Sequence, residues 1–195
     1  SRLSATGTTP ERLVRPSVRR RPMPSMLSKS RVLAGKQCPK RLWLEVNRPE
    51  LRIITPDTER RFEQGHRLND VVHGLYPDGV LLGPEMTLGE ALQRTRRHLL
   101  RTPERPLLGA TLSKHRVLVR ADLFERDDGR WRLTEVKSST RVKPYHLWDC
   151  AVQAWVIGEA GYPVATTRLA HVDTAFVYRG DGAYAGLLKH VDLSQ

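Results

Sequence analysis

Two acidic residues and a lysine occupy neighbouring segments that have the pattern of β-strands. Asp122 lies in the apolar-rich segment 117–125, and Glu135 and Lys137 lie in the segment 131–137. An Asp-Gly pair stands in the short turn between the two segments, which is a strong signal for a β-hairpin. A hairpin places Asp122 and Glu135 on adjacent strands. Two carboxylates beside a lysine can hold Mg²⁺ and stabilise negative charge on a phosphate.

The spacing of Glu135 and Lys137 adds to this interpretation. Residues two apart on a strand point to the same face of the sheet, so the two side chains lie together while Val136 points into the core. The Val136 carbonyl is then free to face a metal at a sheet edge. The simpler alternative is a surface ion pair on an ordinary hairpin, because an isolated Glu-x-Lys is common.

Length and charge suggest one folded domain with a basic extension. The chain has 195 residues and a net charge of +12. Residues 1–25 are rich in Ser, Thr, Pro and Arg without periodicity, which predicts a disordered basic arm before a domain at 26–195. An excess of basic over acidic residues favours a polyanionic partner, and nucleic acid is the commonest one.

The cysteine count and the hydropathy pattern exclude two classes of protein. The two cysteines, Cys38 and Cys150, do not make a disulfide framework, which fits an intracellular, cytoplasmic setting. The sequence has no apolar run long enough to span a membrane and no apolar core of a secretory signal. We therefore expect no membrane partner.

Periodicity predicts an α/β fold with a mixed central sheet flanked by helices. The order is helix, three-strand meander, helix and strand. Helices are expected at 27–33, after Pro39, and at 57–75, 87–102 and 145–160; strands are expected at 80–82, 107–112, 116–125, 130–137, 166–178 and 184–192.

The segment Leu-Thr-Glu-Val-Lys-Ser-Ser at 133–139 closely resembles the catalytic strand of PD-(D/E)XK nucleases. The likeness is strongest to the RecB-like branch, which includes the CRISPR-associated adaptation nucleases. That branch has an acidic residue on the preceding strand, a histidine on an upstream helix and a glutamine on a downstream helix, and Asp122, His66 and Gln153 stand in that order. The resemblance covers about residues 27–180. It looks closest to a domain at the N-terminus of larger bacterial proteins.

The resemblance implies a restriction-endonuclease-like core of order α-β-β-β-α-β and metal-dependent, exonuclease-like hydrolysis of DNA, at duplex ends or on single strands. It implies that His66, Asp122, Glu135 and the Val136 carbonyl hold Mg²⁺ or Mn²⁺. It also implies that Lys137 is the catalytic lysine. The remaining candidates would contact DNA or position the motif strand, and they are Gln153, Tyr145, Arg120 and Lys143. Further basic residues, Lys114, Arg116, Arg141 and the arginines of 94–101, are read equally well as a phosphate track or as a solvated face.

The sequence departs from the family pattern in two places. The strand 107–112 has no acidic residue where many relatives have a glutamate, so one metal position is expected rather than two. Cys38 matches the first cysteine of relatives with an iron–sulfur cluster, but no cysteine follows Cys150, so a cluster is not supported. Cys150 is expected to be a small core residue, and core packing is favoured over base stacking for Trp148 and Trp155.

Two other functions remain open. The missing acid on 107–112 leaves room for a catalytically inactive nucleic-acid-binding module with a nuclease-like fold. The chain could also be a substrate-positioning domain within a larger protein.

Overall fold

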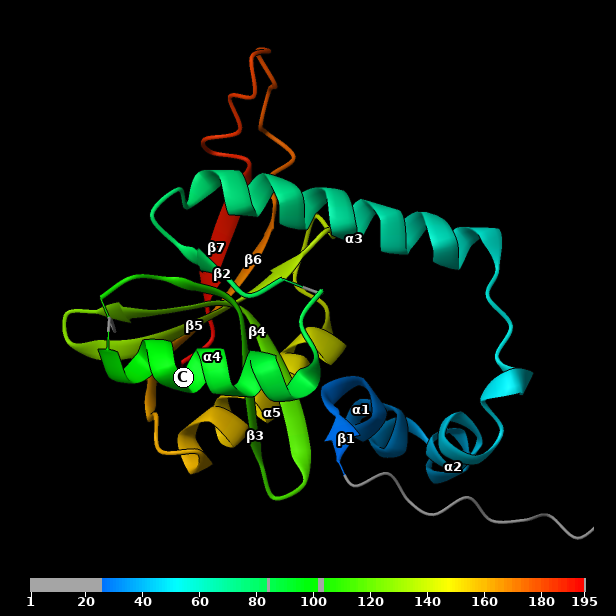
Figure 1. The fold of residues 1–195 in the computed structure, drawn as a ribbon. Helices are drawn as coiled ribbons and strands as arrows, with labels where there is room; N and C mark the ends of the chain where they lie inside the picture. Colours follow the sequence, from blue (N-terminus) through cyan, green and yellow to red (C-terminus); the bar gives the residue numbers. More distant parts are fainter. Residues whose placement is uncertain (1–25, 84, 102–103, 195) are drawn as a thin grey trace, which may run out of the picture.

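The computed structural model describes residues 26–83, 85–101 and 104–194 (Figure 1). The predicted arm at 1–25 lies outside these residues. The helices are α1 (Lys29–Gln37), α2 (Pro39–Asn47), the short 3₁₀ helix η1 (Pro49–Leu51), α3 (Pro56–Leu75), α4 (Leu88–Arg101) and α5 (Pro144–Glu159). The strands are β1 (Leu27–Ser28), β2 (Val80–Leu81), β3 (Leu107–Lys114), β4 (Val117–Asp127), β5 (Arg130–Lys137), β6 (Val164–Val172) and β7 (Leu188–Asp192).

These elements confirm the α/β class and the expected α-β-β-β-α-β order. The sheet runs β2-β3-β4-β5-β6-β7, and β1 pairs with β4 beside this path. Strands β3, β4 and β5 form the antiparallel meander, and α5 carries the chain over to β6, which is parallel to β5. The predicted strands 166–178 and 184–192 were too long, because residues 173–187 form a loop that contains three glycines with positive φ.

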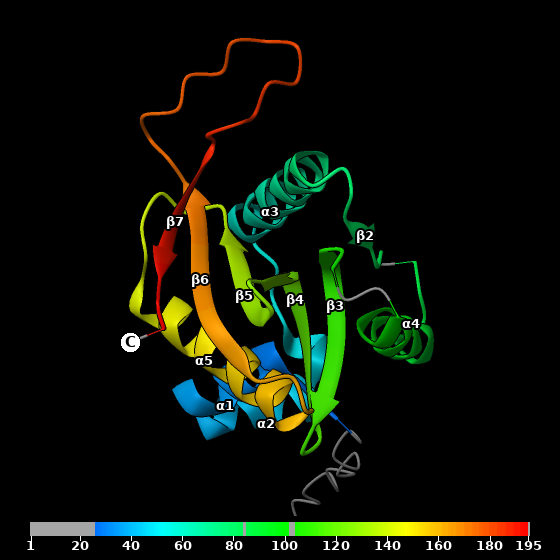
Figure 2. The same ribbon diagram turned by 90° about the vertical axis from the view of Figure 1, so that its left-hand side faces the viewer.

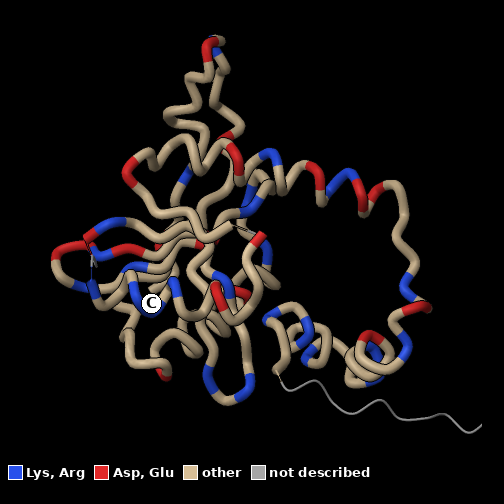
Figure 3. The backbone as a smooth tube through the Cα atoms, viewed as in Figure 1, with Lys and Arg blue, Asp and Glu red and all other residues tan. Residues whose placement is uncertain are grey.

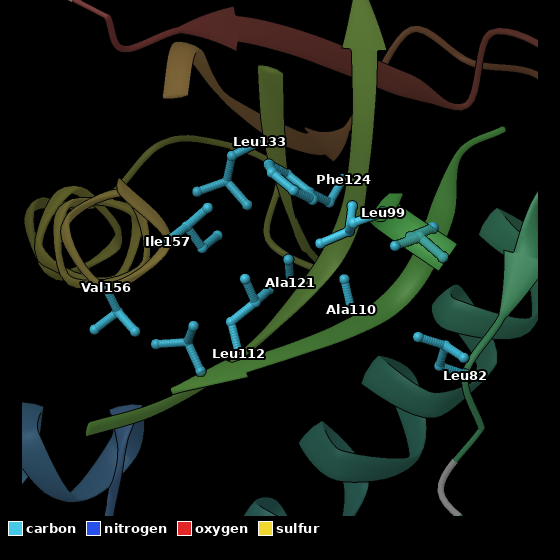
Figure 4. Packing of buried hydrophobic residues seen from close by; sticks show 11 residues of the cluster. Leu82, Leu99, Ala110, Leu112, Ala121, Phe124, Leu133, Val156 and Ile157 are labelled. Carbon is cyan, nitrogen blue, oxygen red and sulfur yellow. The ribbon is translucent and has the colours of Figure 1, made fainter. Parts of the chain in front are cut away.

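Helices cover both faces of the sheet (Figure 2). On one face, Val156 and Ile157 of α5 and Leu99 of α4 pack against Phe124 and Leu133 (Figure 4). On the other face, α3 buries Leu68 and Val72 against a second cluster made by Leu108, Leu123, Val136 and Ala170. The side chains of β5 alternate between the two clusters, so Glu135 and Lys137 point toward α5 while Val136 points toward α3.

The regular pleat of the sheet is interrupted where Gly109 faces Asp122. In β3, Leu107 and Ala110 both pack on the α5 side, although strict alternation would place them on opposite faces. In β4, Ala121 and Phe124 show the same break. Gly109 has φ +79°, a conformation that favours glycine. The alternation of side chains between the two faces of the sheet is therefore interrupted at the position of Asp122.

Strands β4 and β5 separate at the same position. Their ladder runs from Asp127–Arg130 to Leu123–Thr134 and does not extend to Asp122 or Glu135. Beyond the separation, β1 pairs in parallel with Val117 and Leu118. Helix α1 begins directly after β1, with the Ser28 hydroxyl accepting a hydrogen bond from the Arg31 N–H as an N-cap. This pairing places Lys29, the first residue of α1, at the gap between β4 and β5.

The expected packing of Trp148 and Trp155 is wrong. The two rings are 52% and 48% exposed, on the outer side of α5. The Lys36 ammonium lies 3.7 Å from the centroid of Trp148, and the His115 ring stacks on Trp155 with centroids 5.5 Å apart. The helix is apolar on most sides, so sequence periodicity did not separate its inner face from its outer face.

None of the helices in the described residues is long and apolar enough to cross a bilayer.

Candidate active site at the separation of β4 and β5

A cluster of opposite charges fills the space between β5, α1 and α5. The Lys29 ammonium lies 2.8 Å from Glu135 Oε1 and 2.8 Å from Asp149 Oδ1. Lys137 donates to the same two carboxylates, at Glu135 Oε1 and Asp149 Oδ2. Glu135 is only 2% exposed, so its charge is held in a protein environment rather than in water. Two ammonium groups and two carboxylates balance one another in this space.

Gln153 completes the contacts of Glu135. Its side-chain amide donates to Glu135 Oε2, while the two lysines contact Oε1. Gln153 is fully buried and stands one helical turn after Asp149 on α5, so both side chains point toward β5. The predicted glutamine therefore fixes the orientation of the predicted carboxylate.

Asp122 occupies the place where a backbone pair would otherwise form. Its Oδ2 accepts the N–H of Val136 at 2.7 Å, which satisfies a donor released by the separation of β4 from β5. The same contact ties Asp122 to the strand that carries Glu135 and Lys137. Asp122 and Glu135 come from different strands, and this contact holds them together in one compact site.

The charges of this cluster set the pKa of Glu135. Burial alone would raise the pKa of the Glu135 carboxyl, but the Lys29 and Lys137 ammonium groups outweigh burial and lower it to about 2. Burial alone would lower the pKa of both lysines, and the carboxylates of Glu135 and Asp149 outweigh it and raise them. Glu135, Lys29 and Lys137 are therefore all charged at neutral pH.

The pKa of Asp122 is shifted in the opposite direction to that of Glu135. Burial and the neighbouring charge of Glu135 raise the pKa of the Asp122 carboxyl to about 7, against weaker lowering effects of Lys29 and the Val136 N–H. Asp122 is thus poised between its charged and neutral forms near neutral pH. Two carboxyl groups with widely separated pKa values are typical of sites that do acid–base or metal chemistry.

A cavity of about 220 Å³ opens beside Asp122, between α3 and the sheet. Helix α3 presents His66, Asn69 and His73 to it, and β4 contributes Arg120 and Asp122. Gly109 forms part of its wall. Two of the predicted metal ligands, His66 and Asp122, therefore line one cavity, and His73 lines it as well.

The donor groups of this cavity suit a divalent cation in part. Carboxylate oxygen and imidazole nitrogen are both ligands of Mn²⁺, and Mg²⁺ prefers carboxylate oxygen with water. Glu135 does not line this cavity. Its carboxylate oxygens contact Lys29, Lys137 and Gln153 instead. Among the described residues, no three Asp, Glu, His or Cys side chains are close enough together to hold a metal ion.

Tyr145 and Lys143 lie at the start of α5, outside the charged cluster. Lys143 is the N-cap residue of the helix, and its backbone N–H donates to the ring of His146. The Tyr145 ring is 58% exposed, with the Lys143 ammonium 6.0 Å from its centroid. Tyr145 is exposed and Lys143 is half-buried at the start of the helix, where they could contact a long substrate but not Glu135.

Lys29 and Asp149 were not among the residues predicted for the site. Asp149 was detectable, because it precedes Gln153 by four residues and shares its helix face. Lys29 carried no such signal, since its position depends on β1 pairing with β4 far along the chain. Cys38 is exposed, and Cys150 is buried on α5 as expected of a core residue.

Comparison with known proteins gives only distant structural similarity. No family model matches the sequence, and no curated protein is significantly similar to it. The structure of SSO0001 has a TM-score of 0.35 at 12% identity, over 88% of this chain and 69% of that chain. An alkaline exonuclease (LHK-Exo) from Laribacter hongkongensis has a TM-score of 0.35 at 11% identity, over 86% and 76%. Its complex with dAMP has the same TM-score and identity, over 86% and 77%.

Proposed function

We propose that this protein is a deoxyribonuclease of the RecB-like branch of PD-(D/E)XK nucleases, dependent on Mg²⁺ or Mn²⁺ and acting as an exonuclease on DNA. The observation that carries the proposal is the meeting of Asp122, Glu135, Lys137 and Gln153 where β4 and β5 separate. A surface ion pair on a hairpin, the simpler alternative, would not be buried against two further charged residues of α1 and α5.

Each residue has a defined part in this proposal. Asp122 and His66, which line one cavity, would hold the divalent cation, and Glu135 and the Val136 carbonyl would join them if Glu135 exchanges an ammonium contact for the cation. A bound divalent cation would supply positive charge for the phosphate and lower the pKa of a water. Gln153 keeps the Glu135 carboxylate in position.

Lys137 acts by its charge. Its pKa is raised, because the two carboxylates outweigh burial, so the side chain stays an ammonium group and does not accept a proton from water at neutral pH. An ammonium group beside the scissile phosphate stabilises the charge that develops there. Lys29 lies on the same two carboxylates and keeps one positive charge beside Glu135 and Asp149 when Lys137 turns toward a phosphate.

The test compares cleavage of end-labelled single-stranded and duplex DNA with Mn²⁺, with Mg²⁺ and with EDTA. We expect cleavage by the parent protein with either cation, none in EDTA, and a loss of at least a hundredfold for Asp122→Asn. The matched control is Asp128→Asn, the same substitution at the exposed tip of the β4–β5 hairpin, where Asn also tolerates the positive φ of 50°. Absence of cation-dependent cleavage, or equal activity of the two variants, overturns the proposal.

One observation favours the second candidate, a nucleic-acid-binding module without catalysis. Both oxygens of Glu135 are engaged by lysine and glutamine side chains, an arrangement that also stabilises a fold without a metal. Calorimetric titration with Mn²⁺ separates the two functions. The nuclease requires binding that Asp122→Asn abolishes, and the module requires DNA binding that is the same with and without the cation.

A further inference from the structure

A second cavity, of about 520 Å³, lies between α1, α2, η1 and the start of α3. Four arginines line it, Arg31, Arg41, Arg48 and Arg52, and Glu45 is the only acidic side chain among the described residues of its lining. We call this cavity the arginine groove. Its excess of positive charge is complementary to a phosphate backbone.

Two of the four arginines are available to a ligand. Arg41 pairs with Glu45 at 2.8 Å, and Arg48 pairs with Glu50. In the described part of the chain, no carboxylate pairs with Arg31 or with Arg52. Two guanidinium groups without a partner carboxylate, on the wall of one cavity, suit the bidentate geometry of phosphate oxygens.

Apolar side chains stand beside these charges. Ile53 is 85% exposed and Leu51 is 54% exposed, and both line the groove. The Phe62 ring of α3, 47% exposed, lies 5.9 Å from the Arg52 guanidinium carbon. Exposed apolar and aromatic surface next to arginine is the combination that binds unpaired bases together with their backbone. A duplex, whose bases are already stacked, makes no use of it.

The arginine groove adjoins the charged cluster through α1. Lys29 contacts Glu135 and Asp149, and the next two residues of the helix, Ser30 and Arg31, line the groove. The charge view of the chain shows Lys and Arg gathered along α1, α2 and the segment that leads to α3 (Figure 3). Within the part of the chain that the structure describes, the first half of α3 has no buried side chain.

We propose that the arginine groove binds the backbone of single-stranded DNA, with Arg31 and Arg52 on its phosphates and Ile53 and Phe62 against its bases. The groove thereby holds the part of the strand that flanks the phosphate at the Asp122–Glu135 site. This inference rests on the proposed function for the identity of the ligand, and it names single-stranded DNA as the preferred form.

The experiment measures binding of fluorescein-labelled oligo(dT) by anisotropy in EDTA, where cleavage does not interfere. The variant is Arg31→Glu with Arg52→Glu. The matched control is Arg130→Glu with Arg179→Glu, which makes the same change in net charge at the β4–β5 turn and in the 173–187 loop. We expect at least tenfold weaker binding for the groove variant and at most a twofold change for the control.

The salt dependence gives a second measurement. Loss of two phosphate contacts reduces the slope of log affinity against log salt by about 1.4 for a single strand. The double variant Arg31→Lys, Arg52→Lys, which keeps the charge, is expected to bind within threefold of the parent. Equal weakening by groove and control variants, no binding of oligo(dT) by the parent, or equal affinity for duplex DNA overturns the inference.

The experiments distinguish failure of the arginine groove from failure of the proposed nuclease function. Groove-dependent binding without any cation-dependent cleavage refutes the nuclease and keeps the groove. Cation-dependent cleavage that the groove variant performs with the parent's KM keeps the nuclease and refutes the groove.

Discussion

The Lys29 ammonium lies 2.8 Å from Glu135 Oε1, although 106 residues separate the two in sequence. The contact joins the first helix to the central strand of the proposed site. It exists because β1 pairs with β4 at Val117–Leu118, in the space that β5 leaves free. Helix α1 is therefore part of the candidate site.

Removal of the Lys29 charge is expected to destabilise the fold. Lys29→Met leaves Glu135 and Asp149 sharing only Lys137, so one buried carboxylate loses a partner. Breaking a fully buried pair costs about 3–5 kcal/mol, and the 19% exposure of the Lys29 side chain reduces this to about 1–3 kcal/mol. Urea unfolding measures the change. Lys40→Met, at an exposed position on α2, is the control and should unfold with the parent; equal stability of both variants contradicts the prediction.

Asp122 is expected to make stability depend on pH in an unusual direction. Its pKa is raised to about 7 in the folded protein from an ordinary value of 3.8, so between pH 4 and 7 the folded state holds a proton that the unfolded state has lost. The contribution of Asp122 to the free energy of unfolding is therefore largest below pH 4. It falls as the pH rises toward 7, by up to about 1.4 kcal/mol per pH unit.

Comparison with Asp122→Asn isolates this effect. The amide carbonyl can still accept the Val136 N–H, but the side chain does not titrate. In urea unfolding with EDTA at pH 5 and at pH 8, the variant should gain stability relative to the parent as pH rises. A constant difference between the two proteins at both pH values would show that Asp122 titrates normally.

Much of the geometry of the candidate site could be predicted from the sequence, because its central residues lie on one hairpin. The hairpin follows from the Asp-Gly turn, and the alternation of β5 fixes the facing of Glu135 and Lys137. Gln153 required the family resemblance, and Lys29 required the pairing of β1 with β4, which no local pattern encodes. Trp148 and Trp155 were misplaced, because seven-residue spacing shows that two side chains share a face but not which face is buried.

Gly109 is expected to be intolerant of any side chain, for two separable reasons. Its φ of +79° strains other residues, and an added Cβ would lie 2.6 Å from the Leu82 carbonyl oxygen. Gly129→Ala is the matched control: its φ is +73°, but nothing lies within 4 Å of an added Cβ. Both variants should lose about 1–2 kcal/mol from backbone strain, and Gly109→Ala should lose more. Equal losses in urea unfolding would show that the Leu82 contact relaxes freely.

The two cysteines are expected to differ sharply in reactivity. Cys38 is exposed at the start of α2, whereas Cys150 is buried on α5, where burial and the charges of Glu135 and Asp149 raise the pKa of its thiol to about 12. Only the thiolate attacks a disulfide reagent, so Cys150 is protected both by access and by its protonation. With an aromatic disulfide at pH 8, native protein should release one equivalent quickly and guanidinium-unfolded protein two. Cys38→Ser should remove the fast phase, and a fast phase that persists in this variant would place Cys150 in contact with solvent.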